Sequence, residues 1–350
     1  MIHFDQKTKT IICIGSGGVG KTTLSAAIGL GLSLENKKVL VMTIDPSLRL
    51  AQALGIKADG EIHQVEQNLF ACTLNHEKTF RDFITEASQK IKSQNKSDSS
   101  DSVEVEKLLK NKLYQQLSTK LSGSQDFTAL YQLQKFVESK IYDIVILDTP
   151  PAQHTWQFLH AAEKLAQLFN EGVAQWFREA DQKNTPFFKK VFNIGTQQVL
   201  KTLESLTGSE FIKELSAFFS AVQKWQSPLE KQVWAAHKLL SSQETEFVLV
   251  TGLDRSRLDE AQKLSHEIYK QGYNLKSIII NRSLNWNSET KAKDQTIQQY
   301  LNYFKQLQDH LTESKSKFGS HLKVYKCQEV VQDSDYVQSL KNIYQKIQSL

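Results

Sequence analysis

The sequence predicts an α/β fold in which helices cover a mostly parallel β-sheet. Short runs rich in β-branched residues recur along the chain, and most are apolar on both faces, as strands buried in a parallel sheet are. Helical stretches such as residues 22–35 and 259–271 separate several of these runs. A glycine-rich segment follows the first run directly, where such folds turn from strand to helix. The predicted strands cover residues 10–14, 38–44, 69–74, 142–147, 247–251, 277–280 and 322–327.

Two segments interrupt this alternation. Residues 88–107 are poor in apolar residues and rich in Ser, Lys and Asp, which predicts a loop, and we assign residues 88–126 to this loop and a flanking helix. Residues 152–246 are instead dense in aromatic residues, and part of this segment has the i, i+3, i+4 spacing of a helix with one buried stripe. The stripe consists of Phe158, Ala162, Leu165, Phe169, Val173 and Trp176.

These interruptions define the predicted domains. An α/β core would comprise residues 1–87, 127–151 and 247–350, and residues 152–246 would form a helical subdomain inserted into it. The aromatic residues of the insertion either pack as its core or line an apolar groove for a partner helix or a hydrophobic client. The insertion contains no methionine, so an adaptable, Met-rich groove is not expected.

Composition and charge restrict the class of protein. The net charge is +5, but basic and acidic residues are interspersed, so we expect no nucleic-acid partner. Cys13, Cys72 and Cys327 are far apart and form no CxxC pair, which predicts neither disulfides nor a zinc site. The N-terminal segment lacks the features of a signal peptide, and no uninterrupted apolar run of about 18 residues follows. We expect a cytoplasmic protein.

The segment from Gly15 to Thr22 satisfies the pattern G-x-x-x-x-G-K-[ST], between an apolar strand and a helix rich in small residues. Its backbone N–H groups can surround a phosphate, and the positive end of the helix dipole favours negative charge there. We expect Lys21 to reach the β- and γ-phosphates of ATP and the Thr22 hydroxyl to bind Mg²⁺. The predicted phosphate-loop ligands are Gly17, Gly18, Val19, Gly20, Lys21, Thr22 and Thr23.

The same segment also reads Gly15-x-Gly17-x-x-Gly20, a dinucleotide-binding pattern, with Asp45 placed where an acid could bind ribose. Lys21 and the threonines after it favour the phosphate loop, because a dinucleotide fold does not need them. A second acidic strand end supports this choice, since residues 142–147 form an apolar strand followed by Asp148. Such a carboxylate can hold a water bound to Mg²⁺.

With these motifs in place, the chain resembles the ArsA family of ATPases, which includes arsenical-pump ATPases and tail-anchored-protein-targeting ATPases, within the wider class of MinD and ParA. Residues 15–23 resemble the family's phosphate loop GKGGVGKTT. Residues 44–50 (IDPSLRL) and 148–155 (DTPPAQHT) resemble its two switch segments, DPAHSL and DTAPTGHT. Residues 278–281 resemble a strand that ends in an adenine-binding Asn.

The resemblance implies a role for each matching residue. Asp45 would position or activate the attacking water, while Asp148 and the peptide after it would sense the γ-phosphate. Asn281, together with the loop after Cys327, would hold the adenine. The family's P-loop carries a signature lysine where this chain has Ser16, and that lysine crosses a dimer interface to the partner's nucleotide. A comparable arginine finger accelerates hydrolysis by roughly 10³ to 10⁵.

Without that lysine, the chain is expected to hydrolyse ATP slowly as a homodimer, or to pair with a paralogue that carries the lysine. The first switch also departs from the family, with Leu48 and Arg49 where His and Ser are usual. The scattered cysteines offer no arsenite-binding trio, so arsenite binding is poorly supported.

Two functions fit this sequence. In the first, a dimeric switch ATPase couples its nucleotide state to movement of the helical insertion, which binds a hydrophobic client or partner. In the second, a positioning ATPase of the MinD or ParA type acts at a membrane or nucleoid surface through a C-terminal amphipathic helix. The apolar residues of that helix are Tyr336, Leu340, Ile343, Tyr344, Ile347 and Leu350. We favour packing of this helix on the sheet, so peripheral membrane contact is the less favoured interpretation.

Overall fold

The structure is a computed structural model, and it describes residues 2–45, 49–94, 122–150, 158–161, 226–283, 322–329 and 335–349, together with the single positions 302, 306 and 309. The chain divides into two compact units, of which unit 1 comprises residues 1–75, 133–157 and 238–350. Unit 2 comprises residues 76–132 and 158–237.

Unit 1 is built on a nine-stranded sheet in the order β3-β4-β2-β5-β1-β6-β7-β8-β9. All central pairings are parallel, and only the two edge pairs, β3 with β4 and β8 with β9, are antiparallel. The strands are β1 (Thr10–Gly15), β2 (Val39–Thr43), β3 (His63–Glu66), β4 (Leu69–Thr73), β5 (Ile144–Asp148), β6 (Thr245–Thr251), β7 (Leu275–Ser283), β8 (Lys323–Gln328) and β9 (Ile347–Ser349).

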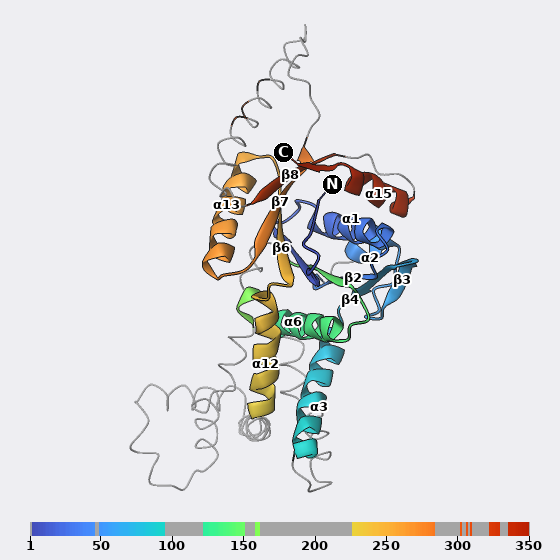
Figure 1. Cartoon of the computed structure of the whole chain (residues 1–350), viewed down its shortest axis with the longest axis vertical. Coiled ribbons are helices and arrows are strands. Elements are labelled where there is room, and N and C mark those ends of the chain that lie inside the picture. The colour runs from blue at the N-terminus through green and yellow to red at the C-terminus, as the bar shows by residue number, and fades with distance from the viewer. Residues whose placement is uncertain are drawn as a thin grey trace, which may run out of the picture. The chain divides into compact units, whose positions relative to one another are not determined.

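The central strands are apolar on both faces because helices cover both sides of the sheet. Every residue of β1, β2, β5 and β6 is buried. Helices α1 (Lys21–Leu34), α2 (Arg49–Leu54) and α15 (Tyr336–Gln345) lie on one side, and α13 (Arg255–Lys270) lies on the other, as Figure 1 shows. The predicted fold class, a mostly parallel sheet covered by helices, is confirmed.

The C-terminal segment packs on the sheet rather than standing apart from it. The side chains of Leu340 and Tyr344 are buried in the main core, and the Tyr344 hydroxyl donates a hydrogen bond to Glu35 at 3.2 Å. The expectation of one continuous helix to residue 350 is wrong, because α15 ends at Gln345 and Ile347 begins β9 beside β8. The packing interpretation of this segment is confirmed for its buried residues.

Unit 2 contains α3 (His76–Gln94) and parts of α6 (Ser122–Glu138) and α12 (Gln226–Leu240). An aromatic cluster forms its described core, in which the ring of Phe83 lies 4.8 Å from that of Phe127 and 5.2 Å from that of Tyr131. All three side chains are buried.

Several predicted features fall outside the described residues. These are most of the loop at 88–126, most of the helical insertion at 152–246, Pro46 to Leu48 of the first switch, and the second switch from Pro151 onward. Phe158 and Leu159 at the start of the insertion are described, and both are buried. The predicted domain ranges therefore remain a prediction.

Candidate nucleotide-binding site

The turn from β1 to α1 requires glycine at two of its positions. Gly15 has φ +149°, and a Cβ atom there would lie 2.0 Å from the carbonyl oxygen of Val250 on the neighbouring strand. Gly20 caps the N-terminus of α1 in the left-handed conformation with φ 92°, which a residue with a Cβ atom adopts at a steric cost. These two glycines let the loop fold closely against β6 and present the free N–H groups of the first helical turn.

Lys21, at the first position of α1, points back across this loop. Its ammonium donates hydrogen bonds to the carbonyl oxygens of Gly15 and Ser16, each at 2.9 Å. Burial lowers the pKa of Lys21, while Asp148 and Asp45 oppose that effect by stabilising the charged form. The loop therefore holds a partly desolvated cation, which favours an anionic ligand.

Three parallel strands bring a group of oxygen atoms together beside Lys21. Asp148 ends β5 between β1 and β2, where its register partners are Cys13 and Thr43. Its Oδ2 atom accepts hydrogen bonds from the hydroxyl of Thr22 at 2.7 Å and from that of Thr43 at 3.0 Å. The Asp45 N–H donates in turn to Thr43 Oγ1 at 3.1 Å, so Thr43 links the two acidic residues.

The other oxygen of Asp148 carries the evidence for a metal site. Asp148 is fully buried, and its Oδ1 atom has no hydrogen-bond partner within the described part of the chain. Burial raises the pKa of this carboxyl to about 6, although the bonds from Thr22 and Thr43 and the charge of Lys21 act against the rise. A buried carboxylate oxygen without a partner, next to a threonine hydroxyl, is the kind of oxygen-donor set that suits Mg²⁺. The residues present therefore fit this cation.

A cavity of about 540 Å³ opens beside this group of oxygens and is lined by most of the predicted phosphate-binding residues. Asp45 lines its wall, so the acid expected to orient water lies at the same cavity as Lys21 and Thr22. The lining comprises Gly18, Gly20, Lys21, Thr22, Thr23, Asp45, Arg49, Gln52, Ala53, Thr149, Arg282 and Tyr336.

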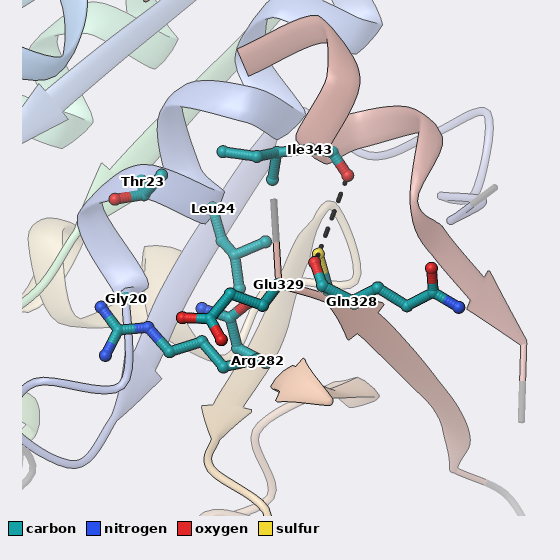
Figure 2. A pocket seen from close by; sticks show the side chains of 9 residues that line it. Gly20, Thr23, Leu24, Arg282, Gln328, Glu329 and Ile343 are labelled. Carbon is teal, nitrogen blue, oxygen red and sulfur yellow. Dashed lines mark hydrogen bonds between the residues drawn. The ribbon is translucent and has the colours of Figure 1, made fainter. Parts of the chain in front are cut away.

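A second cavity, of about 250 Å³, adjoins the other side of the loop (Figure 2). It brings Asn281 together with Cys327, Gln328 and Glu329, which is the combination expected for an adenine pocket. The Asn281 side-chain amide donates a hydrogen bond to the carbonyl oxygen of Val19 at 2.8 Å. This bond holds the end of β7 against the phosphate loop. It uses the amide nitrogen of Asn281, so the amide oxygen takes no part in the contact with Val19.

Ser16, which stands in place of the family's lysine, faces inward. Its hydroxyl donates a hydrogen bond to Glu260 Oε2 at 2.6 Å, and only 6% of the residue is exposed. Glu260 lies on α13, so this bond joins the phosphate loop to a helix on the far side of β6. The predicted residues Gly17, Val19 and Thr23 lie on the loop and first helical turn as expected.

Sequence comparison assigns this architecture to a family. The profile of the ArsA ATPases, described as anion-transporting ATPase, matches residues 8–348. The chain belongs to the ArsA ATPase family. It is 27% identical over 288 residues to ATPase asna-1 of Caenorhabditis elegans, which covers 80% of this chain and 76% of that protein. It is 24% identical over 283 residues to ATPase get3 of Aspergillus terreus, covering 80% and 75% respectively.

Within this ArsA-family chain, the structure adds a site residue that the motifs did not identify. Thr43 is the last residue of an apolar strand, and only the register of β2 beside β5 places its hydroxyl on Asp148. Thr149 belongs to the segment that resembles the second switch; its hydroxyl donates to the Cys13 carbonyl oxygen at 2.8 Å, and it lines the larger cavity. Thr43 was visible in the sequence only as a polar residue at the end of an apolar strand.

Cys13, Cys72 and Cys327 lie on β1, β4 and β8, and all three are buried and none forms a disulfide. No group of three or more His, Cys, Asp or Glu side chains arranged to hold a metal occurs among the described residues. Within the same residues, no helix is long and apolar enough to cross a membrane.

Proposed function

We propose that this protein binds Mg·ATP at the loop between β1 and α1 and hydrolyses it slowly, as a dimeric switch whose helical insertion binds a hydrophobic client or partner. The observation that carries the proposal is the position of Asp148, whose buried Oδ1 atom has no partner in the described chain and whose Oδ2 atom accepts from Thr22. Membership of the ArsA ATPase family supports the same reaction.

In this mechanism the loop amides and Lys21 bind the β- and γ-phosphates. To do so, the Lys21 ammonium exchanges its bonds to the Gly15 and Ser16 carbonyl oxygens for phosphate oxygens. Thr22 and Asp148 would hold Mg²⁺, which neutralises phosphate charge when bound. Asp45, on the wall of the phosphate cavity, orients the attacking water and can accept its proton.

The network around Thr43 offers a route from hydrolysis to movement. The Asp45 N–H and the Asp148 carboxylate are both hydrogen-bonded to the Thr43 hydroxyl. A shift in the position of one acidic residue therefore alters the hydrogen bonding of the other. Both acids lie at the starts of the predicted switch segments, and the second switch leads into the predicted insertion at residues 152–246. We infer that loss of the γ-phosphate is transmitted along this path.

The slow rate follows from Ser16. A serine held by Glu260 supplies no positive charge to a partner's nucleotide. The test is Ser16→Lys alone and with Glu260→Gln, since the Glu260 carboxylate would otherwise retain the new ammonium. The expected result is an ATPase rate raised at least about tenfold in the double variant, a small part of what a trans cation can supply. An ATPase rate unchanged in both variants would remove this part of the proposal. So would a rate raised equally when the parent is mixed with Lys21→Ala chains, which cannot bind nucleotide and carry no lysine at position 16.

The MinD-like or ParA-like alternative gains no support from the C-terminal segment. Leu340, Tyr344 and Ile347 are buried in the core, so three of the apolar residues that a membrane helix would need are already packed. Assembly with a second copy or with a paralogue carrying the lysine, and a cytoplasmic location, belong to the proposal.

A further inference from the structure

Arg282 has an uncommon backbone conformation at the end of β7. Its φ is 56°, in the left-handed region that residues with a Cβ atom seldom adopt. The β7–β8 register shifts between Ile280 and Ser283, so Asn281 and Arg282 form an irregularity in an otherwise regular parallel pairing. Bulges of this kind beside ligand sites redirect a side chain. Here the redirected side chain is the one that follows the expected adenine-binding Asn281.

The redirected guanidinium lies where the two cavities meet. Only Gly20, Thr23 and Arg282, among the described residues, line both the larger phosphate cavity and the smaller cavity beside Asn281. Figure 2 shows the Arg282 side chain extended away from β7, with its guanidinium toward the end of the loop that carries Gly20. Arg49, by contrast, lines the phosphate cavity alone.

Within the described chain, the Arg282 guanidinium has neither a hydrogen bond nor an ion pair. Lys21 is engaged by two loop carbonyl oxygens, so it differs from Arg282 in this respect. Glu329 lines the smaller cavity and Asp45 the larger one, but no ion pair joins either of them to Arg282. An exposed guanidinium without a counter-ion, which lines the same two cavities as Gly20 and Thr23 at the start of α1, is suited to bind a phosphate group.

We propose that Arg282 binds the phosphate nearest the ribose, the α-phosphate of the bound nucleotide. The inference rests on the proposed function, because it takes the smaller cavity as the site of the base and the larger as that of the β- and γ-phosphates. The α-phosphate joins these two parts of a nucleotide, and Arg282 lies at the corresponding junction. Arg282 is then a binding residue that acts equally on substrate and product.

The test is calorimetry with adenosine, AMP, ADP and Mg·ATP on the full chain. Arg282→Gln removes the guanidinium, and Arg282→Gly is a second variant that suits the left-handed backbone at this position. Lys270→Gln is the matched control, because Lys270 is an exposed cation at the last turn of α13 and lines neither cavity. The expected result is a loss of roughly 10- to 100-fold in affinity for AMP, ADP and Mg·ATP alike, with adenosine unchanged.

Three results would overturn the proposal. An equal loss in Lys270→Gln would show that only long-range charge attraction is involved. A loss confined to Mg·ATP would place the guanidinium on the terminal phosphates, and unchanged binding of AMP would leave Arg282 without a role. If the parent chain binds no phosphorylated ligand, the proposed function itself fails; parent binding together with unaffected Arg282 variants refutes this inference alone.

Discussion

Replacement of Asp148 by Asn should stabilise the ligand-free protein at neutral pH while it weakens Mg·ATP binding. The carboxyl is fully buried, and burial raises its pKa from 3.8 to about 6. At about 1.4 kcal/mol per pKa unit, this shift of roughly two units costs the folded state about 3 kcal/mol once the group is ionised. Asn keeps an oxygen that can accept from Thr22 or Thr43 and carries no charge to desolvate.

The sign of the pH dependence follows from linkage. The folded state binds the proton of the Asp148 carboxyl more tightly than the unfolded state does. The contribution of Asp148 to the free energy of unfolding is therefore greatest below pH 3.8 and declines until the pH exceeds about 6. About half of the roughly 3 kcal/mol is lost between about pH 5 and pH 7. The Asn variant lacks this loss, so its advantage over the parent should grow across that interval.

Urea unfolding followed by tryptophan fluorescence, with a chelator and without nucleotide, measures this difference. The quantity compared is the difference in the free energy of unfolding between variant and parent, and how this difference changes between about pH 5 and pH 7. A hydrogen bond lost in the variant contributes equally at the two pH values and so does not affect this change. Added Mg·ATP should raise the unfolding midpoint of the parent and not that of the variant. A stability difference that is independent of pH, or that favours the parent more as pH rises, would show that burial of Asp148 does not disfavour its ionised form.

Four further predictions concern the loop, the core, the serine and the C-terminus. Gly15→Ala should destabilise the protein by at least about 2 kcal/mol in urea unfolding, because the new Cβ would meet the Val250 carbonyl oxygen. Gly55→Ala, also at positive φ but in open space, should cost less stability. Equal losses of stability in the two variants would contradict this prediction. Leu340→Ala should cost about 2–5 kcal/mol, since this side chain fills the core between α15 and α1, and a cost near zero would mean that α15 is not docked. Glu260→Gln should change ATP affinity less than tenfold if its bond to Ser16 only positions the loop, as fluorescence titration would report. Co-sedimentation with anionic liposomes should show no ATP-dependent pelleting, and pelleting would favour the positioning ATPase instead.

The central strands were predictable because their chemistry is local. Runs such as residues 142–147 are apolar on both faces, and a carboxylate directly after such a run marks the functional edge of a parallel sheet. The edge strands β3 and β9 were not predicted. They have four and three residues, with several exposed positions, so they lack the continuous apolar pattern on which prediction depends.

The polar connections of the site could not be predicted, because they depend on register and on contacts distant in sequence. Thr43 reaches Asp148 only because β2 and β5 align these two residues. Ser16 and Glu260 are separated by 244 positions, and Asn281 and Val19 by 262, yet each pair shares a hydrogen bond. The irregularity that redirects Arg282 likewise arises from the pairing of β7 with β8 and leaves no signal in the local sequence.

Calorimetric titration of Mg·ATP into the parent chain and into Lys21→Ala tests directly whether this loop binds the triphosphate. We expect a single class of site in the parent, with affinity that falls when Mg²⁺ is chelated. In the variant we expect at least about a hundredfold weaker binding, because the buried ammonium of the loop is lost. Equal heats from the two proteins, or none from the parent, would contradict the claim that this loop binds the triphosphate.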